Sequence, residues 1–462
     1  MEDAQPFFAS GNYAPIATEH DVTDLPIRGE IPHGLRGTLF RNGPNPQSAA
    51  PDPAAHHWFL GDGMVHGFTL GEGRASWRNR WVRTDKFLAE RAAGRALSIG
   101  FGGARETGIP DTGLANTSLV HHAGRLLALE EAHLPWALDP ATLETRGVED
   151  FGGQIRRFTA HPKADPATGE LVFFGYSTAG PLSAEMAWGT LSPAGAVTRH
   201  ERFPVPFCAM VHDFAVTERH VLFPLMPLTG SLPRAMRGGP AFAWEPELGG
   251  HVGLLRRADG VASLRWFRAE ACYAFHVLNA WEDAAGRVLA DVMESRRPAA
   301  LPPCRWQPEP EGGDPGPPDP LGAGPGGGHG CLPARAAGRP ARRVPPDGRP
   351  PRRPAQPPRR LYGPVARRGA RHPRLVRPGD RGRRHFTVPA GDALSEAVFV
   401  PRSAAAEEGD GWLMTVAWRA TEGRSELLVL DSQDVAAGPV ATVALPGRVP
   451  HGFHGTWVPA DG

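Results

Sequence analysis

The sequence predicts an all-β protein. Short apolar segments of strand length recur along most of the chain, and turn residues separate them. The clearest of these segments are residues 67–71, 75–83, 125–129, 170–176, 221–226, 252–256, 288–292, 397–401, 411–418 and 425–431. Residues 86–96 are the single helical candidate. Short strands and turns at this density indicate an all-β architecture.

The N-terminal part combines an irregular lead with two predicted turns. Four prolines interrupt residues 1–35, so we expect no regular structure there. Asn42-Gly-Pro-Asn-Pro46 contains the residues that fix turns. Gly61-Asp-Gly63 is a second tight turn, and His57 and His66 flank it. Further along, the run from Asp165 to Gly169 predicts a hairpin turn.

Length and composition bound the class of protein. The chain has 462 residues, which we assign to one domain, 1–462, and its formal net charge of +1 does not favour binding to nucleic acid. Its four cysteines form no C-x-x-C pair, and no apolar run reaches the 18 or more residues of a membrane span. The N-terminus lacks the basic and apolar pattern of a signal segment. We therefore expect a cytoplasmic protein.

The histidine at position 212 is the first candidate for chemistry. It lies in residues 206–223, which predict two strands, 210–217 and 220–226, joined by a Glu218-Arg219 turn. Alternation places His212 on the more apolar face, with Phe214. A buried imidazole needs a partner, because burying an unpaired polar group costs about 1–3 kcal/mol. By itself, such a residue is more often a core histidine bonded to a carbonyl than a metal ligand.

Three further histidines lie in similar surroundings. His161, His276 and His454 each stand beside an apolar or aromatic run and close to a strand-like segment. The first three histidines are 51 and 64 residues apart, and His454 follows after another 178. These separations resemble one histidine per blade of a propeller, whose period is about 40–50 residues, with about three blades in the last gap. A chain with 19 histidines contains many such sets, so spacing alone is weak evidence.

Several motifs together make the chain resemble the carotenoid cleavage oxygenase family, which includes apocarotenoid and lignostilbene dioxygenases. The resemblance covers residues 10–297 and 386–460. The residues that carry it are 35–46, 57–67, 116–120, 126–131 and 395–402, together with the four histidine segments 158–163, 206–223, 272–282 and 450–457. It implies a seven-bladed β-propeller with a non-haem ferrous ion, Fe(II), on its axis. By motif, the four iron ligands would be His161, His212, His276 and His454.

The same resemblance assigns two carboxylates. In the family a glutamate at the place of Glu131 accepts the N–H of a metal-bound histidine, and Glu396 matches a second such glutamate. Carboxylates of this kind fix the tautomer and orientation of the imidazole. Glu130 is the alternative to Glu131, and a solvated carboxylate at a strand edge is the alternative for Glu396.

Other histidines compete with the four. We weighed His57 and His66 as ligands and expect them to be structural, because their motif shapes the fold in the family. His451 is the rival of His454. The pattern Gly-Phe-His-Gly favours His454, because backbone can approach closely beside its glycine.

The segment 296–384 departs from the rest of the chain. It is rich in Pro, Gly and Arg and contains almost no strand-forming pairs, so composition predicts disorder. A third glutamate motif of the family is absent from it. We consider two origins, a frameshift in the coding DNA and a genuine disordered insertion. Shifting assumed codons for residues 376–381 by one base yields Ser-Asp-Leu-Ala-Thr, a plausible hairpin turn. The propeller is expected to be incomplete or disordered here.

The resemblance implies an enzyme, a non-haem Fe(II) dioxygenase that cleaves a conjugated C=C bond of a carotenoid or apocarotenoid-like substrate with O2 to give carbonyl products. One alternative is a stilbene-cleaving dioxygenase, although members of that type often have Lys where this chain has Glu130. Others are an inactive, poorly folded product of a frameshifted gene, a propeller that only binds or holds a hydrolytic Zn, and an isomerase. The expected partners are a small apolar polyene or stilbene-like substrate and O2, without nucleic acid. We expect a monomer with possible transient membrane contact.

Overall fold

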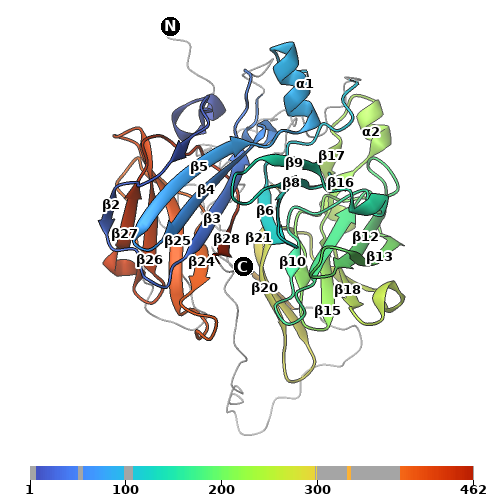
Figure 1. Ribbon diagram of the computed structural model, residues 1–462. Helices are drawn as coiled ribbons and strands as arrows, with labels where there is room; N and C mark the ends of the chain where they lie inside the picture. Colours follow the sequence, from blue (N-terminus) through green and yellow to red (C-terminus); the bar gives the residue numbers. More distant parts are fainter. Residues whose placement is uncertain are drawn as a thin grey trace, which may run out of the picture.

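Antiparallel β-sheets provide most of the regular structure of the chain (Figure 1). The computed structural model describes residues 7–49, 56–97, 108–296, 298 and 386–460, and the backbone of the strand Gly330–Pro333. Seven sheets are found within these residues, and all their strand pairs are antiparallel. The predicted all-β class is therefore confirmed.

The two ends of the chain share two sheets. The N-terminal sheet has the strand order β1-β5-β4-β3-β28. Its strands are β1 (Asp21–Val22), β5 (Arg74–Trp81), β4 (Gly63–Gly71), β3 (Gly37–Pro44) and β28 (Gly455–Pro459). In the C-terminal sheet, β2 pairs with β27. Its strands are β2 (Ile27–Gly29), β27 (Pro439–Ala444), β26 (Arg424–Asp431), β25 (Gly411–Arg419), β23 (Ala393–Leu394) and β24 (Val398–Pro401). Each end thus contributes a strand to the sheet of the other, which places the blue and red ribbons side by side (Figure 1).

The middle of the chain forms the remaining sheets in sequence order. One sheet contains β6 (Ser118–His122), β7 (Arg125–Leu129), β8 (Trp136–Leu138) and β9 (Thr145–Val148). The next contains β10 (Lys163–Ala164), β11 (Leu171–Tyr176), β12 (Glu185–Leu191) and β13 (Val197–Pro204). The third contains β14 (Ala215–Val216), β15 (His220–Leu225), β18 (Gly250–Arg256) and β19 (Arg265–Ala269). The chain between β15 and β18 forms a separate two-stranded sheet of β16 (Leu228–Gly230) and β17 (Phe242–Trp244). The last contains β20 (Tyr273–Glu282), β21 (Val288–Ser295) and β22 (Gly330–Pro333).

Edge strands of several sheets lie beside one another. β28 contacts both β6 and β24, and β14 contacts β20. These strands, together with β10, are edge strands of their sheets. The segments that enter them therefore converge on a common region of the molecule, and the candidate site lies there.

Helices are few. α1 (Asp85–Ala93) agrees with the predicted helix 86–96, and it begins where the Thr84 hydroxyl accepts the N–H of Phe87. It ends at Gly94, whose φ of +65° a glycine adopts without strain. α2 (Leu232–Met236) is a single turn that the sequence did not predict. Short 3₁₀ turns occur at Phe7–Ala9, Gly11–Tyr13, Trp58–Leu60, Phe151–Gly153, Pro246–Leu248, Gly260–Ser263 and Val435–Ala437.

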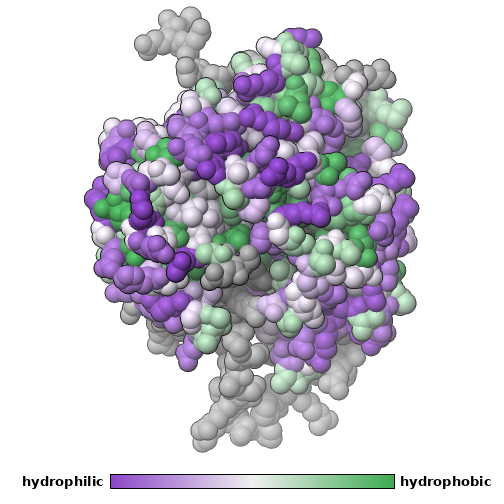
Figure 2. Space-filling model, viewed as in Figure 1, coloured by the Kyte–Doolittle hydropathy of each residue, from purple (hydrophilic) through white to green (hydrophobic). Residues whose placement is uncertain are grey.

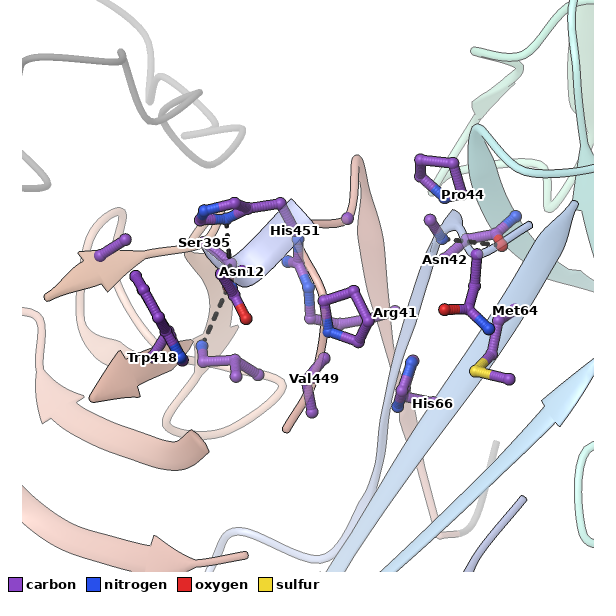
Figure 3. Close-up of a pocket in the computed structure, with 16 residues that line it drawn as sticks. Asn12, Arg41, Asn42, Pro44, Met64, His66, Ser395, Trp418, Val449 and His451 are labelled. Atoms are coloured by element: carbon purple, nitrogen blue, oxygen red, sulfur yellow. Dashed lines mark hydrogen bonds between the residues drawn. The ribbon is translucent and has the colours of Figure 1, made fainter. Parts of the chain in front are cut away.

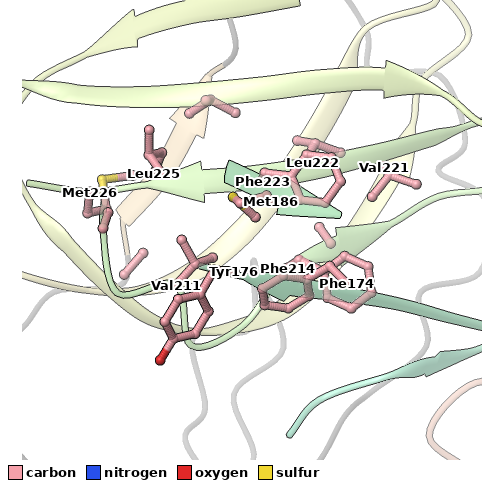
Figure 4. Packing of buried hydrophobic residues seen from close by; sticks show 14 of the residues in the cluster. Phe174, Tyr176, Met186, Val211, Phe214, Val221, Leu222, Phe223, Leu225 and Met226 are labelled. Atoms are coloured by element: carbon pink, nitrogen blue, oxygen red, sulfur yellow. The ribbon is translucent and has the colours of Figure 1, made fainter. Parts of the chain in front are cut away.

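The largest apolar cluster lies between the sheets of β10–β13, β14–β19 and β20–β21 (Figure 4). Phe174, Phe214 and Phe223 are fully buried in it, and the rings of Phe174 and Phe214 have centroids 4.8 Å apart. Burying one such side chain stabilises the fold by about 1.5–3 kcal/mol. The cluster anchors the segment just before β14, which carries His212.

Four sequence predictions need correction or qualification. The lead 1–35 contains β1 and β2 and is not wholly irregular. The predicted turn at Asn42 is wrong, because β3 continues to Pro44. The predicted strand 210–217 pairs only as β14, although the Glu218-Arg219 turn and the second strand are found. Within 296–384, residues 330–333 pair with β21 as β22, and the prediction of disorder or frameshift otherwise falls outside the described residues.

The described residues contain no helix long and apolar enough to cross a membrane. On the face shown in Figure 2, polar and hydrophobic residues are interspersed. Three large apolar side chains around α2 are exposed, Leu232, Met236 and Leu248, and Met236 is 79% exposed.

Candidate metal centre

Four histidines from different sheets meet at the inner strand edges. His161 lies two residues before β10, His212 three before β14, His454 directly before β28, and His276 within β20. One ring nitrogen of each lies within 4.8 Å of the others. The Nε2 atoms of His161 and His212 are 2.9 Å apart. The structure thus brings together all four histidines that the sequence predicted as ligands.

The four imidazoles surround one point edge-on. Neighbouring rings have centroids 4.5–5.3 Å apart and stand at 65–83° to one another. Burial, and the charge that each neighbouring imidazole would carry, lower the pKa of His161 and His276 well below the usual value. The imidazoles of His161 and His276 are therefore neutral, and their nitrogen lone pairs are free to bind a cation.

The Nε2 atom of His276 gives a direct test of whether a metal fits. This atom is buried and has no hydrogen-bond partner. A buried polar atom without a partner costs about 1–3 kcal/mol. A cation bound by the four nitrogens would satisfy it, so the residues present fit a metal ion. Four imidazoles suit a borderline metal such as Fe, Zn or Cu, and a ligand set without carboxylate leaves net positive charge on the ion.

Two carboxylates orient two of the histidines. Glu131 Oε1 accepts from His212 Nδ1 at 2.5 Å, and Glu396 Oε1 accepts from His454 Nδ1 at 2.9 Å. With Nδ1 protonated, Nε2 of each ring carries the lone pair that points toward the other histidines. Within the described part of the chain, no carboxylate bonds to His161 or His276.

Glu131 and its neighbour Glu130 have different hydrogen-bond partners, although both side chains are buried. The second oxygen of Glu131, Oε2, accepts the Tyr176 hydroxyl at 3.0 Å. Burial, together with the charge of Glu131, raises the pKa of Tyr176 well above its usual value, so this hydroxyl remains a donor. Glu130 instead accepts the backbone N–H groups of Leu114 and Ala115 and has a local structural role. Sequence reasoning found Glu131 but missed Tyr176.

Arg41 supports the second carboxylate, and sequence reasoning missed it as well. Its Nη1 donates to the backbone carbonyl of Glu396 and lies 3.7 Å from Oε2, and its Nη2 donates to the carbonyl of Phe453. Glu396 Oε2 also accepts the N–H of Gly455. Arg41 therefore joins the segment of Glu396 to the segment of His454. Figure 3 shows Arg41 beside a small cavity between β3 and the C-terminal sheet.

The rival histidines lie elsewhere. His451 is in contact with Asn12 and Tyr13 at the cavity of Figure 3. His57 accepts the N–H of Phe59 in a 3₁₀ turn, and His66 accepts the indole N–H of Trp77. Burial lowers the pKa of His57 to about 4 and that of His66 to about 3, and Arg41 adds to the shift of His66.

Comparison with known proteins gives matches over nearly the whole chain. The family model described as retinal pigment epithelial membrane protein matches residues 13–317 and 350–459. The gap in this match, 318–349, is narrower than the segment 296–384 for which we expected no match. The chain is 37% identical to isoeugenol monooxygenase of Pseudomonas nitroreducens, over 97% of each protein. It is 34% identical to carotenoid cleavage oxygenase of Mycobacterium tuberculosis, over 99% of this chain and 98% of the relative. Among solved structures, lignostilbene dioxygenase of Pseudomonas brassicacearum matches with a TM-score of 0.82 and 33% identity, over 99% of both chains.

Proposed function

The chain belongs to the carotenoid cleavage oxygenase family and is a C=C-cleaving dioxygenase of its type, and we propose that it uses Fe(II) and O2 to cleave a conjugated double bond into two carbonyl products. The observation that carries this proposal is the convergence of four imidazole nitrogens within 4.8 Å of one another. Two of the rings are oriented by Glu131 and Glu396.

We propose His161, His212, His276 and His454 as the iron ligands, with Glu131 and Glu396 as their positioning partners. Iron, when bound, supplies the redox chemistry of the reaction with O2. The chain's own residues hold the four nitrogens in place, and Glu131 and Glu396 keep Nδ1 of His212 and His454 protonated. The finer architecture that we propose is a seven-bladed β-propeller with the metal on its axis. The convergence of the inner strand edges and the sharing of sheets by the two chain ends support it.

The first candidate substrate is a carotenoid or apocarotenoid-like polyene. An aryl-conjugated alkene, such as a stilbene or a propenylphenol, is the second. The 37% identity to isoeugenol monooxygenase over 97% of each protein favours this second candidate, as does the fold match to lignostilbene dioxygenase. The sequence argument against it rested on Glu130, whose carboxylate is engaged by backbone N–H groups. We therefore give residue 130 no weight in choosing between them.

We propose a small apolar substrate and O2 as the only partners, and a monomer in solution. The exposed side chains of Leu232, Met236 and Leu248 support transient contact with a membrane that holds an apolar substrate. Light scattering at several protein concentrations tests the monomer, and flotation with neutral lipid vesicles tests the contact.

The test uses the full chain, purified without oxygen and loaded with Fe(II). An apocarotenal, resveratrol and isoeugenol are each added with O2, and the aldehyde products and the O2 consumed are measured. We expect cleavage of one class with equimolar O2 and alkene, and none in the metal-free protein. Iron-loaded, cooperatively folded protein that cleaves none of the three would contradict the proposal and support the inactive alternative. Sequencing the coding DNA for residues 294–400 tests the proposed frameshift.

A further inference from the structure

An ion pair between a partly buried lysine and a buried aspartate lies against three of the four histidine segments. Lys163 Nζ and Asp213 Oδ1 are 2.7 Å apart. Lys163 follows His161 by two residues, and Asp213 follows His212 directly. The pair therefore connects the segment that enters β10 with the segment that enters β14.

The Asp213 carboxylate also reaches the third segment. Its Oδ2 accepts the backbone N–H of Val277, the residue after His276, at 2.8 Å. Its Oδ1 accepts the N–H of Phe214 at 2.8 Å. The Asp213 carboxylate thus connects three candidate ligands. It follows His212 directly, it pairs with Lys163 near His161, and it accepts the backbone N–H of the residue after His276. This contact matters most for His276, because no carboxylate in the described part of the chain bonds its ring.

Packing leaves the pair little freedom. The side chain of Asp213 is 3% exposed, and that of Lys163 is 20% exposed. The Lys163 ammonium lies 5.8 Å from the ring centroid of Phe214, which is fully buried against Phe174 (Figure 4). The exposed side of Lys163 faces a cavity of about 980 Å³.

The choice of lysine is itself informative. The chain contains 50 basic residues, and only Lys86 and Lys163 are lysines. Both form ion pairs with buried carboxylates, and Lys86 itself is 4% exposed between Asp62 and Glu90. An ammonium is a compact point charge, whereas a guanidinium is a wide planar fork. Both lysines of this chain therefore place a compact positive charge beside a buried carboxylate.

We propose that Lys163 and Asp213 are positioning residues that set the spacing of His161, His212 and His276, an inference that rests on the proposed metal site. Removing the Asp213 carboxylate releases three ligand segments from a common anchor, and removing the Lys163 ammonium releases the His161 segment from it. Loss of a partner bonded directly to a ligand ring lowers metal affinity by about 10- to 100-fold, and we expect the same range for this pair because it joins three ligand segments. The inference differs from a general stabilising role, because a stabilising pair elsewhere would leave the affinity of the folded protein unchanged.

The test is a titration of the metal-free full chain with Co²⁺ alone, followed by its visible absorption bands. Lys163→Met removes the charge and retains most of the length of the side chain. Lys163→Arg restores the charge, and the adjoining cavity has room for the larger guanidinium. Lys86→Met is the matched control, because it removes the other buried lysine from an ion pair in α1. Thermal unfolding of each metal-free protein reports fold stability separately.

We expect Lys163→Met to bind Co²⁺ about 10- to 100-fold more weakly than wild type, with shifted bands. Lys163→Arg should recover part of the affinity, and Lys86→Met should lose thermal stability but keep wild-type affinity and bands. If Lys163→Met does not fold, Asp213→Asn takes its place with the same expectation. Wild-type affinity and bands in the Lys163 or Asp213 variant, or an equal loss in Lys86→Met, would overturn the inference. A wild-type protein that binds no Co²⁺ would instead refute the metal site itself.

Discussion

Replacing Glu131 with glutamine tests the orientation of the metal site. The glutamine side chain retains an oxygen that can accept the His212 Nδ1–H, so this contact persists without the negative charge. The amide nitrogen takes the place of the oxygen that accepts the Tyr176 hydroxyl, which weakens that second contact. A hydrogen bond to a charged partner contributes about 1.5–3 kcal/mol and a neutral one about 0.5–1.5 kcal/mol. A metal on Nε2 makes the Nδ1–H a stronger donor, so the charged acceptor stabilises the metal-bound protein more than the metal-free protein. The difference of about 1–1.5 kcal/mol between the two kinds of bond is therefore lost from the free energy of metal binding.

Converted at about 1.4 kcal/mol per decade, this difference predicts a loss of metal affinity of about tenfold. It lies at the lower end of the range of about 10- to 100-fold for such outer carboxylates. The bond from the Tyr176 hydroxyl to Glu131 exists with or without the metal. Its weakening therefore lowers the stability of the fold and not the affinity for the metal.

The neighbouring residue supplies the control. Glu130→Gln removes an equally buried carboxylate one position away, whose partners are the backbone N–H groups of Leu114 and Ala115. Competition with a chelator of known affinity measures the metal dissociation constant of both variants. We expect Glu131→Gln to weaken binding about tenfold and Glu130→Gln to leave it unchanged. Equal constants for the two variants would refute the reasoning.

Three further predictions concern the ligands and the fold. His454→Gln should lower metal affinity by more than the roughly 10- to 100-fold of an outer partner, whereas His451→Gln should retain a full equivalent of metal; metal analysis after gel filtration measures both, and similar losses would contradict the choice of His454. Removing the metal with a chelator should lower thermal stability, since metal at a hundredfold excess over Kd adds about 2.7 kcal/mol to the free energy of unfolding; identical melting with and without metal would show that none is bound. The pKa of His66 is about 3 in the folded protein and 6.5 for an exposed histidine. Below pH 6.5, His66 is therefore protonated in the unfolded chain but stays neutral in the folded protein. The free energy of unfolding then falls by about 1.4 kcal/mol per pH unit until about pH 3. Urea unfolding of metal-free protein at about pH 7.5 and about pH 5.5, on either side of the ordinary histidine pKa, should show this loss in wild type and a smaller one in His66→Gln, and equal losses would exclude His66 as the cause.

Much of the strand content could be predicted from the sequence, because turn residues bound each apolar run. The segment around His212 shows why the rest could not. Residues 210–217 have a strand pattern, yet only Ala215–Val216 join the ladder. The carboxylate of Asp213 accepts the N–H of Phe214 itself and bonds to Lys163 and Val277. A local pattern cannot reveal these contacts of Asp213, because Lys163 and Val277 are distant from it in sequence.

The candidate site was predictable from its motifs and not from spacing. His454 is 178 residues from His276, and only folding brings the two rings to a centroid distance of 5.1 Å. Glu130 and Glu131 both follow the same apolar run, so the sequence pattern around them is alike. In the structure, the hydrogen bond from His212 distinguishes Glu131 from Glu130. Tyr176, Arg41 and the Lys163–Asp213 pair carry no motif signal of their own, since each acts through a contact with a distant segment.

The most direct test of the central claim is an anomalous difference map from crystals of the iron-loaded protein, recorded at the iron absorption edge. The account predicts one strong peak among the four ring nitrogens of His161, His212, His276 and His454, with Glu131 and Glu396 hydrogen-bonded behind their histidines. A peak at His451, His57 or His66, or a folded, iron-treated protein with no peak among the four, would contradict it.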